Sequence, residues 1–246
     1  MLPTPTAGTS LLRRVVAAAL LAAGLTGAAI AQAPSKNLAP GFADLAKDAR
    51  VVIMPVDVEL FSLSAGGVAE PKADWTASAH EHMKTALNAR TGKIGLKADR
   101  MEETAADEFG EQVGLHAAVA RSIALHHSGG GVWALPTKEG KLDWSFGDAM
   151  KPLADKTGAQ YALFIWVRDS YASAERKAAM AAIAILSLGR VVLGTGIQTG
   201  YASLVDLRSG NVVWFNRLIS TTGDLREAAP AAATVENLMA GFPALK

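Results

Sequence analysis

The sequence predicts a single α/β domain: a mixed sheet with helices packed on it, a carboxy-terminal β-hairpin and an apolar inserted segment. Residues 161–167 (YALFIWV) have no polar side chain on either face, which predicts a central strand covered on both sides. Residues 201–207 and 212–219 flank an Arg-Ser-Gly-Asn turn, which is typical of an antiparallel hairpin. Helical spacing of apolar residues precedes these strands, and such alternation is typical of an α/β sheet.

Strand and helix patterns also alternate in the first half of the chain. Residues 51–58 (VVIMPVDV) predict a strand, and Pro55, which lacks a donor for the ladder, marks a sheet edge or a bulge in it. Asp74 is expected to begin a helix that ends at Gly92. The later patterns predict short strands at residues 94–97 and 132–135, and helices at residues 104–128, 146–157 and 234–239.

The amino terminus has the order of a secretory signal peptide. An arginine pair precedes the apolar run at residues 15–25, and small residues follow at residues 29–33. The run is too short and too rich in alanine to predict a retained membrane anchor. We therefore expect a periplasmic protein, with residues 1–33 removed as the signal peptide, 34–47 as a flexible lead and 48–246 as one domain with an apolar insertion at 172–199.

Charge and cysteine content exclude several classes of function. The chain has 24 Lys and Arg against 23 Asp and Glu, and removal of the two signal arginines leaves 22 against 23. A near-neutral chain without a basic cluster argues against a nucleic-acid partner. The chain has no cysteine, which excludes disulfides, thiolate catalysis, Cys-ligated metal and the lipidated cysteine of a lipoprotein.

The apolar run at residues 178–197 permits three interpretations. As a transmembrane helix it is barely long enough, and Arg190 near its middle would cost about 2.5–3.5 kcal/mol. As a peripheral arm, residues 178–188 would form a helix that turns its apolar side chains toward a membrane or a neighbouring subunit. The simplest alternative is a helix followed by a strand at residues 191–193, both buried on the sheet.

Three motifs in order resemble a bacterial envelope group. They are the apolar strand at residues 51–58, the entry Gly-Ala-Gln-Tyr-Ala-Leu-Phe at residues 158–164, and the hairpin at residues 202–214. Together they resemble the group that contains the curli secretion channel (CsgG-like proteins) and the amino-terminal domain of the Tol translocation protein B. The resemblance covers roughly residues 51–219 and implies a periplasmic domain that assembles with itself or with envelope partners. Channel formation does not follow, because the apolar run lacks the alternation of a membrane-inserted hairpin.

The histidines are weak candidates for metal ligands. In the helix expected there, His80 and His82 diverge by about 200° around the axis. His126 and His127 lie near a helix end, where capping of carbonyls is the simpler account. His116 is eleven residues before His127, with no carboxylate at ligand spacing beside either. No metal and no cofactor is therefore expected.

The preferred hypothesis is a non-enzymatic envelope assembly or scaffold protein that acts through self-association or an envelope protein partner. No Gly-x-Ser-x-Gly elbow occurs, and Gly194-Thr195-Gly196 predicts a turn or a close-packing site rather than a phosphate loop. The alternative is a periplasmic hydrolase or metal-binding protein that uses the histidines. Contact of the run with a membrane surface is a further option. The surface expected to meet the partner or the membrane comprises Met180, Ile183, Leu186, Arg190, Val191 and Leu193.

Overall fold

The computed structural model describes residues 35–191 and 194–246, and the predicted signal peptide lies outside them. The seven-stranded main sheet and a two-stranded sheet account for the strands of this part of the chain. The main sheet contains β2 (Arg50–Ile53), β3 (Asp57–Leu63), β4 (Ala69–Pro71), β5 (Lys97–Arg100), β6 (Tyr161–Ala172), β7 (Gln198–Asp206) and β8 (Val212–Ser220).

Strand β6 is the centre of the main sheet. It runs parallel to β2 and β3 along one edge and antiparallel to β7 along the other, and β8 continues the sheet as the hairpin partner of β7. The sheet is therefore mixed, and the predicted central strand and hairpin are confirmed. The β7–β8 turn needs glycine at Gly210, because a Cβ there would lie 2.0 Å from the carbonyl oxygen of Gly147.

The strand predicted at residues 51–58 is two strands, with a break at Pro55. Residues 51–53 and 57–63 both pair with β6, and residues 54–56 lie opposite only residues 164 and 165. The extra residue is a bulge, one of the two outcomes expected from a proline that cannot donate to a ladder.

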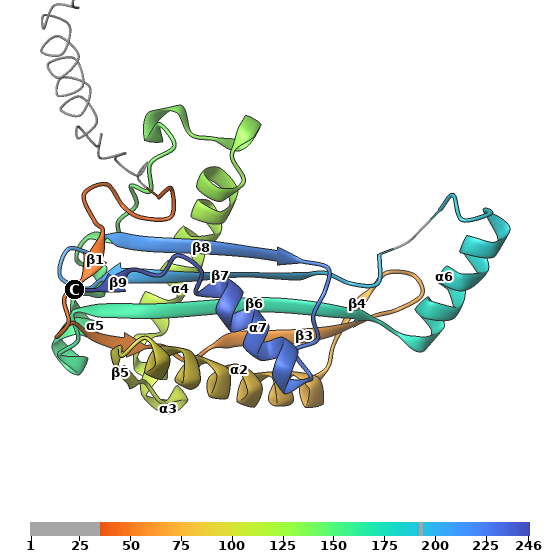
Figure 1. Cartoon of the computed structure of the whole chain (residues 1–246), viewed down its shortest axis with the longest axis horizontal. Coiled ribbons are helices and arrows are strands. Elements are labelled where there is room, and N and C mark those ends of the chain that lie inside the picture. Colours follow the sequence, from red (N-terminus) through yellow and green to blue (C-terminus); the bar gives the residue numbers. More distant parts are fainter. Residues whose placement is uncertain (1–34, 192–193) are drawn as a thin grey trace, which may run out of the picture. The chain divides into compact units, whose positions relative to one another are not determined.

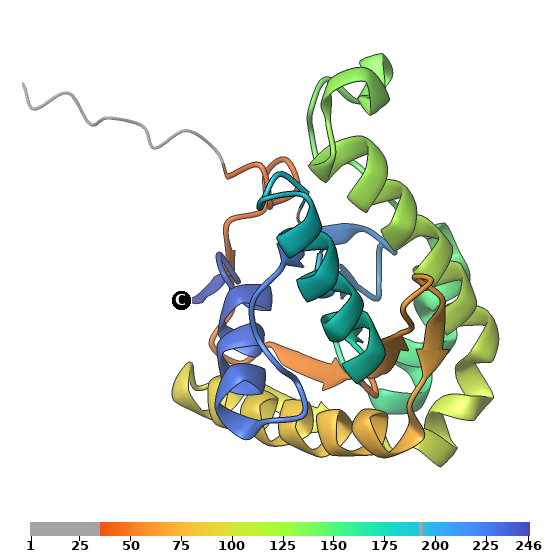
Figure 2. The ribbon, with the colours of Figure 1, turned by 90° about the vertical axis from the view of Figure 1, so that its right-hand side faces the viewer.

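Helices cover both faces of this sheet (Figures 1 and 2). Helices α2 and α7 pack on one face, where Met83, Leu87 and Leu238 are buried, and α4 and α5 pack on the other, where Ile123 and Leu153 are buried. The helices are α2 (Ala73–Lys93), α3 (Glu103–Ala106), α4 (Gly110–Ile123), α5 (Lys151–Thr157), α6 (Ala174–Leu186) and α7 (Ala228–Leu238). Burial of both faces explains why YALFIWV carries no polar alternation.

Three local predictions were wrong or displaced. Residues 132–135 form no strand, because Gly131–Trp133 is a 3-10 turn that opens on two glycines of positive φ. The strand expected at residues 94–97 begins only at Lys97. The strand predicted at residues 161–167 continues to Ala172, and Asp169, paired on both sides, is only 3% exposed.

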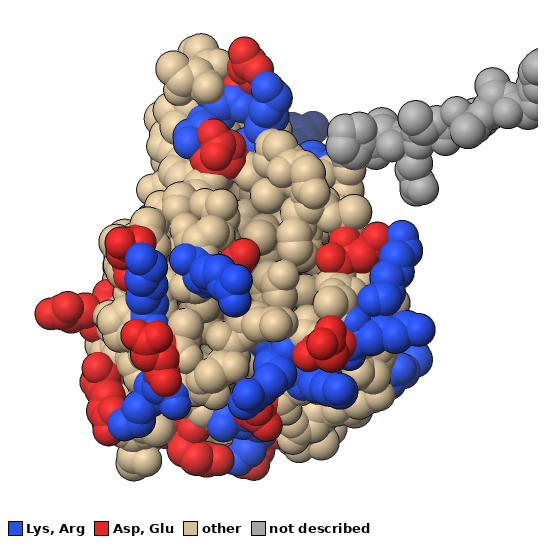
Figure 3. Space-filling view, turned by 90° about the vertical axis from the view of Figure 1, so that its left-hand side faces the viewer, with Lys and Arg blue, Asp and Glu red and all other residues tan. Residues whose placement is uncertain are grey.

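The described part of the expected flexible lead is attached to the domain. Leu38 forms a bridge with Trp214, and β1 (Asp44–Leu45) pairs in parallel with β9 (Ala244–Leu245). On the face of the molecule at this end, Lys and Arg alternate with Asp and Glu in the part of the chain that is described (Figure 3). That face therefore carries mixed charge rather than a patch of one sign.

The apolar insertion leaves the sheet at the opposite end (Figure 1). We call residues 172–199 the arm. Within it, Ser173 caps α6 by accepting a hydrogen bond from the backbone N–H of Arg176. No residue of α6 is buried, so the interpretation as a buried helix is wrong for the described residues. Across residues 35–191 and 194–246, no helix is long and apolar enough to cross a membrane.

Candidate functional site

The end of the arm presents bulky apolar side chains to solvent. Ile185, Leu186 and Leu188 are 74%, 85% and 86% exposed, and Val191 is 44% exposed. Single exposed apolar residues are normal on a protein surface, but four within seven residues form a patch that marks a contact site. We call these four residues the arm tip.

Leu188 is held in a backbone conformation that leucine rarely adopts. Its N–H donates to the carbonyl of Ile185 (3.1 Å) and the N–H of Gly189 donates to the carbonyl of Ala184 (2.7 Å), the two bonds of a Schellman motif that ends α6. Leu188 is the left-handed residue of that motif, with φ of 51°. Glycine normally occupies this position, because a left-handed residue with a Cβ costs about 1–2 kcal/mol. Leu188 is thus both strained and exposed, and nothing within the domain accounts for a leucine there.

The surface predicted from sequence overlaps the arm tip only in part. Leu186, Arg190 and Val191 are exposed, as that prediction needs, whereas Met180 and Ile183 are half-buried. Leu193 lies outside the described residues. The exposed apolar surface of the arm is therefore concentrated at the carboxy-terminal end of α6 and the turn after it.

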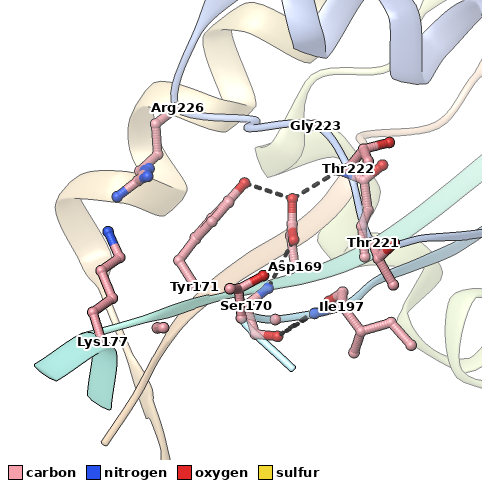
Figure 4. A pocket seen from close by; sticks show the side chains of 13 residues that line it. Asp169, Ser170, Tyr171, Lys177, Ile197, Thr221, Thr222, Gly223 and Arg226 are labelled. Atoms are coloured by element: carbon pink, nitrogen blue, oxygen red, sulfur yellow. Dashed lines mark hydrogen bonds between the residues drawn. The ribbon is translucent and has the colours of Figure 1, made fainter. Parts of the chain in front are cut away.

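A buried carboxylate holds the base of the arm to the domain. One oxygen of Asp169 accepts hydrogen bonds from the Tyr171 hydroxyl (2.5 Å) and from Nε2 of Gln198 (2.7 Å), and the other accepts from the backbone N–H of Ser170 (2.8 Å). Figure 4 shows Asp169, Ser170 and Tyr171 beside a cavity of about 180 Å³, which Gln198 also lines. Burial raises the pKa of Asp169, and these three donors act against that shift.

The same cluster joins the arm to the loop before α7 and to α7 itself. The Tyr171 hydroxyl accepts the backbone N–H of Leu225 (2.7 Å), and the Thr234 hydroxyl donates to Oε1 of Gln198 (3.0 Å). The guanidinium of Arg226 lies over the Tyr171 ring, 4.2 Å from its centroid. Because the Asp169 carboxylate is saturated by internal donors, the geometry indicates a structural clamp rather than a general base.

A larger cavity of about 400 Å³ lies where α3 and α4 cross the break between β2 and β3. We call it the α4 pocket. Its floor is aromatic: Trp166 and Tyr201 stack at 5.1 Å, and Phe164 stacks on His116 at 3.8 Å between centroids. The lining residues are Met54, Pro55, Val56, Asp57, His80, Glu103, Ala106, Asp107, Gly110, Val113, His116, Ala117, Phe164, Ile165, Trp166 and Tyr201.

The histidines proposed as metal candidates do not converge. His116 is buried and Nε2 of its ring lies 2.6 Å from the Ser203 hydroxyl. His82 contacts the carbonyl of Leu225 and His127 the carbonyl of Lys36, whereas Nδ1 of His80 is 3.7 Å from Glu103. In the part of the chain that the structure covers, no three His, Asp or Glu side chains gather as metal ligands.

Comparisons with known proteins give no family. No family model matches the sequence, and no curated protein matches it. The solved structures that align with it include the PelC dodecamer from Paraburkholderia phytofirmans (12% identity, 83% of this chain and 94% of that chain, TM-score 0.38), the lipoprotein GNA1162 from Neisseria meningitidis (14%, 76% and 93%, 0.29) and the LpoB C-terminal domain from Salmonella enterica (12%, 75% and 88%, 0.27).

At such identities and TM-scores, these structures assign no residue role and no activity to this chain. None of the three is described as a curli secretion channel or a Tol translocation protein, so the resemblance stated from the sequence stays a prediction at fold level.

Sequence reasoning missed the Asp169 cluster. Polar residues directly after an apolar run suggested a strand end, and Gln198, 29 residues further on, lay inside the segment interpreted as apolar. Asp169 and Gln198 are register partners across β6 and β7, and this pairing has no local signal in the sequence.

Proposed function

We propose that this protein is a non-enzymatic assembly protein of the bacterial cell envelope, and that it self-associates through the arm tip. Envelope location rests on the signal-peptide pattern at residues 1–33. The single observation that carries the docking role is Leu188, a fully apolar side chain that is 86% exposed in a strained left-handed position. Strained backbone conformations cluster at functional sites, so a strained and exposed apolar residue supports a docking role.

A second copy of the chain is the occupant that the arm fits best. Residues 173–197 contain no Trp, Tyr or Phe, the side chains that anchor proteins at membrane interfaces. Helix α6 instead carries six alanines in thirteen residues (AERKAAMAAIAIL), and small side chains let two helices approach closely. The same patch on two copies forms the self-complementary contact of a two-fold dimer.

Absence of a converged catalytic set supports a non-enzymatic role. Within the described residues, the buried carboxylate of Asp169 is saturated by donors, and His116 is buried against Phe164 with Ser203 as its polar partner. The Ser203 hydroxyl is only 1% exposed and no third group among the described residues orients the His116 ring, so this pair lacks the arrangement that acyl transfer or hydrolysis needs.

Leu188→Gly tests the proposal without weakening the fold. Glycine relieves the left-handed strain, so the variant should unfold at the same temperature as the native protein or a higher one. It should nonetheless weaken self-association at least tenfold, because the most exposed apolar side chain of the arm tip is lost. Sedimentation velocity of the mature chain over a concentration series measures the dissociation constant, and circular dichroism measures the melting temperature.

Val132→Gly is the matched control, since Val132 is 93% exposed but lies outside the arm. It should leave association unchanged. A native chain that stays monomeric at high micromolar concentration would overturn self-association. If the native chain sediments with lipid vesicles and the Leu188→Gly variant does not, the arm tip contacts a membrane and the proposal of self-association is overturned.

A further inference from the structure

The α4 pocket exists because small residues of α3 and α4 face large aromatic residues of the sheet. Ala106, Gly110 and Ala117 line the helical side, and their small side chains leave a gap between the helices and the floor formed by β6 and β7. A Cβ added at Gly110 would meet nothing within 4 Å. One turn beyond the pocket, Ala120 and Ile123 of the same helix are buried against the sheet. A cavity of about 400 Å³ is within the size range of small-molecule sites.

Two hydrogen-bond donors at the floor lack partners among the described residues. Tyr201 is only 3% exposed, yet its hydroxyl makes no hydrogen bond with them, and burial raises the pKa of Tyr201 to about 12. Nε1 of Trp166 is buried and has no partner either. Trp144 and Trp214 share that property, but only Trp166 of the three lines this pocket. Nε1 of Trp166 is enclosed by the protein, whereas Tyr201 lines the cavity with a hydroxyl that is free to donate, so the floor favours a ligand that carries an oxygen acceptor.

The ionisable groups of the lining are acidic. They comprise three carboxylates and two histidines, and the lining contains no Lys or Arg. Arg168 neutralises Asp57 at 2.7 Å, and burial lowers the pKa of His116 to about 3, which keeps its ring neutral. Glu103 has His80 at 3.7 Å, and Asp107 makes no ion pair within residues 35–191 and 194–246. The carboxylates of Glu103 and Asp107 therefore favour a cation at the mouth of the α4 pocket.

We propose that the α4 pocket binds a small amphipathic amine: an apolar body the size of an aromatic ring, a carbonyl or hydroxyl oxygen, and a protonated amino group. The apolar body lies on Phe164, Trp166 and Tyr201, and the oxygen accepts from the Tyr201 hydroxyl. The amino group faces Glu103 and Asp107. This site is separate from the arm tip and does not depend on self-association.

Three probes with the same ring separate the contributions of charge and shape. They are L-phenylalaninamide (cation), N-acetyl-L-phenylalaninamide (neutral) and N-acetyl-L-phenylalanine (anion). Saturation-transfer NMR on the mature chain should show binding in the order cation, neutral, anion. The double variant Glu103→Gln with Asp107→Asn should weaken the cation about tenfold and leave the neutral probe unchanged, because only the charge interaction is removed.

Gly110→Leu fills the pocket and should abolish binding of all three probes. Its matched control is Gly114→Leu, one turn along α4, where a Cβ also meets nothing within 4 Å but the residue does not line the pocket. Both changes replace a helical glycine, so neither should destabilise the fold. The proposal is overturned if L-phenylalaninamide does not bind at 10 mM, if the neutral or anionic probe binds as well as the cation, or if Gly110→Leu binds as the control does.

Discussion

At the scale of single residues, His116 has the most unusual environment of the described histidines. Its ring stacks on Phe164 and is only 4% exposed, and burial lowers the pKa of His116 to about 3. In the unfolded chain the ring takes a proton near pH 6.5. Between these two values the unfolded chain binds a proton that the folded chain does not, so stability is fully present above about pH 6.5 and is lost as the pH falls.

His116→Gln should remove this acid sensitivity. For the native protein, the contribution lost from pH 7 to pH 4 is about 3 kcal/mol, given about 1.4 kcal/mol per pH unit. Glutamine stays neutral and keeps a donor for the Ser203 hydroxyl. The free energy of unfolding, measured in urea from pH 4 to pH 7, should therefore fall less steeply with acid in the variant. Parallel curves for the two proteins would contradict the burial argument, and His127→Gln controls for loss of a histidine outside the core.

The roles of individual residues were harder to predict from the sequence than the helices and strands. Sequence spacing gave no convergent metal site from the histidines as an expectation, but it could not separate His116, which lies in the core, from His127, which is half-buried. The role of Asp169 was missed for the same physical reason: its partners Tyr171 and Gln198 come together only when β6 and β7 pair. A carboxylate that ends an apolar run has the same local sequence whether it is solvated or clamped.

At the scale of elements, Gly196 allows the arm to return to the sheet. Its φ is 154°, and a Cβ there would lie 1.8 Å from the carbonyl oxygen of Ser170. The neighbouring backbone is closely paired, because Ser170 exchanges hydrogen bonds with Ile197 and the N–H of Ala172 donates to the carbonyl of Thr195 (2.6 Å). The sequence prediction of a turn or close-packing site at residues 194–196 agrees with this geometry.

Gly196→Ala should therefore open the base of the arm. We expect a loss of about 1–3 kcal/mol, the usual range for a backbone forced into a sparsely populated conformation. Hydrogen exchange should speed up at residues 169–172 and 197–200 more than in α2. Gly194→Ala is the matched control, because a Cβ at Gly194 meets nothing within 4 Å. Equal hydrogen-exchange protection in the Gly196→Ala and Gly194→Ala variants would show that the close approach of Gly196 to Ser170 does not hold the base of the arm.

Periodicity in the sequence predicted most helices and strands, but it did not predict burial where tertiary contacts determine it. The apolar run YALFIWV and the 201–219 hairpin were predicted because burial on two faces and turn chemistry are local signals. The sequence did not determine whether the arm is buried or exposed, because an alanine-rich apolar helix has the same composition in either case. What decides is that β6 extends past the helices α2 and α7 that cover the sheet, so that α6 begins where no core surface remains (Figure 1).

At the scale of the whole molecule, the two cores and the arm are separable. Both cores lie between the sheet and the helices α2, α4, α5 and α7, and α6 contributes no buried residue to either. The arm also begins and ends at one point, because the N–H of Ala172 meets the carbonyl of Thr195. Its removal therefore needs only a tight turn between paired strands, and the entropy of closing that turn is smaller than that of closing the native segment.

Replacement of residues 174–193 by Asn-Gly should leave the domain folded, with a melting temperature within about 5 °C of the native value, since no buried apolar area is lost. The Asp169 cluster keeps all its partners in this variant, because Tyr171, Gln198, Leu225 and Thr234 remain. Calorimetry and hydrogen exchange check this: a cooperative transition with native protection in β6 and β7 is expected. A non-cooperative transition would mean that the arm stabilises the sheet, and the arm tip could then no longer be treated as a docking device separate from the fold.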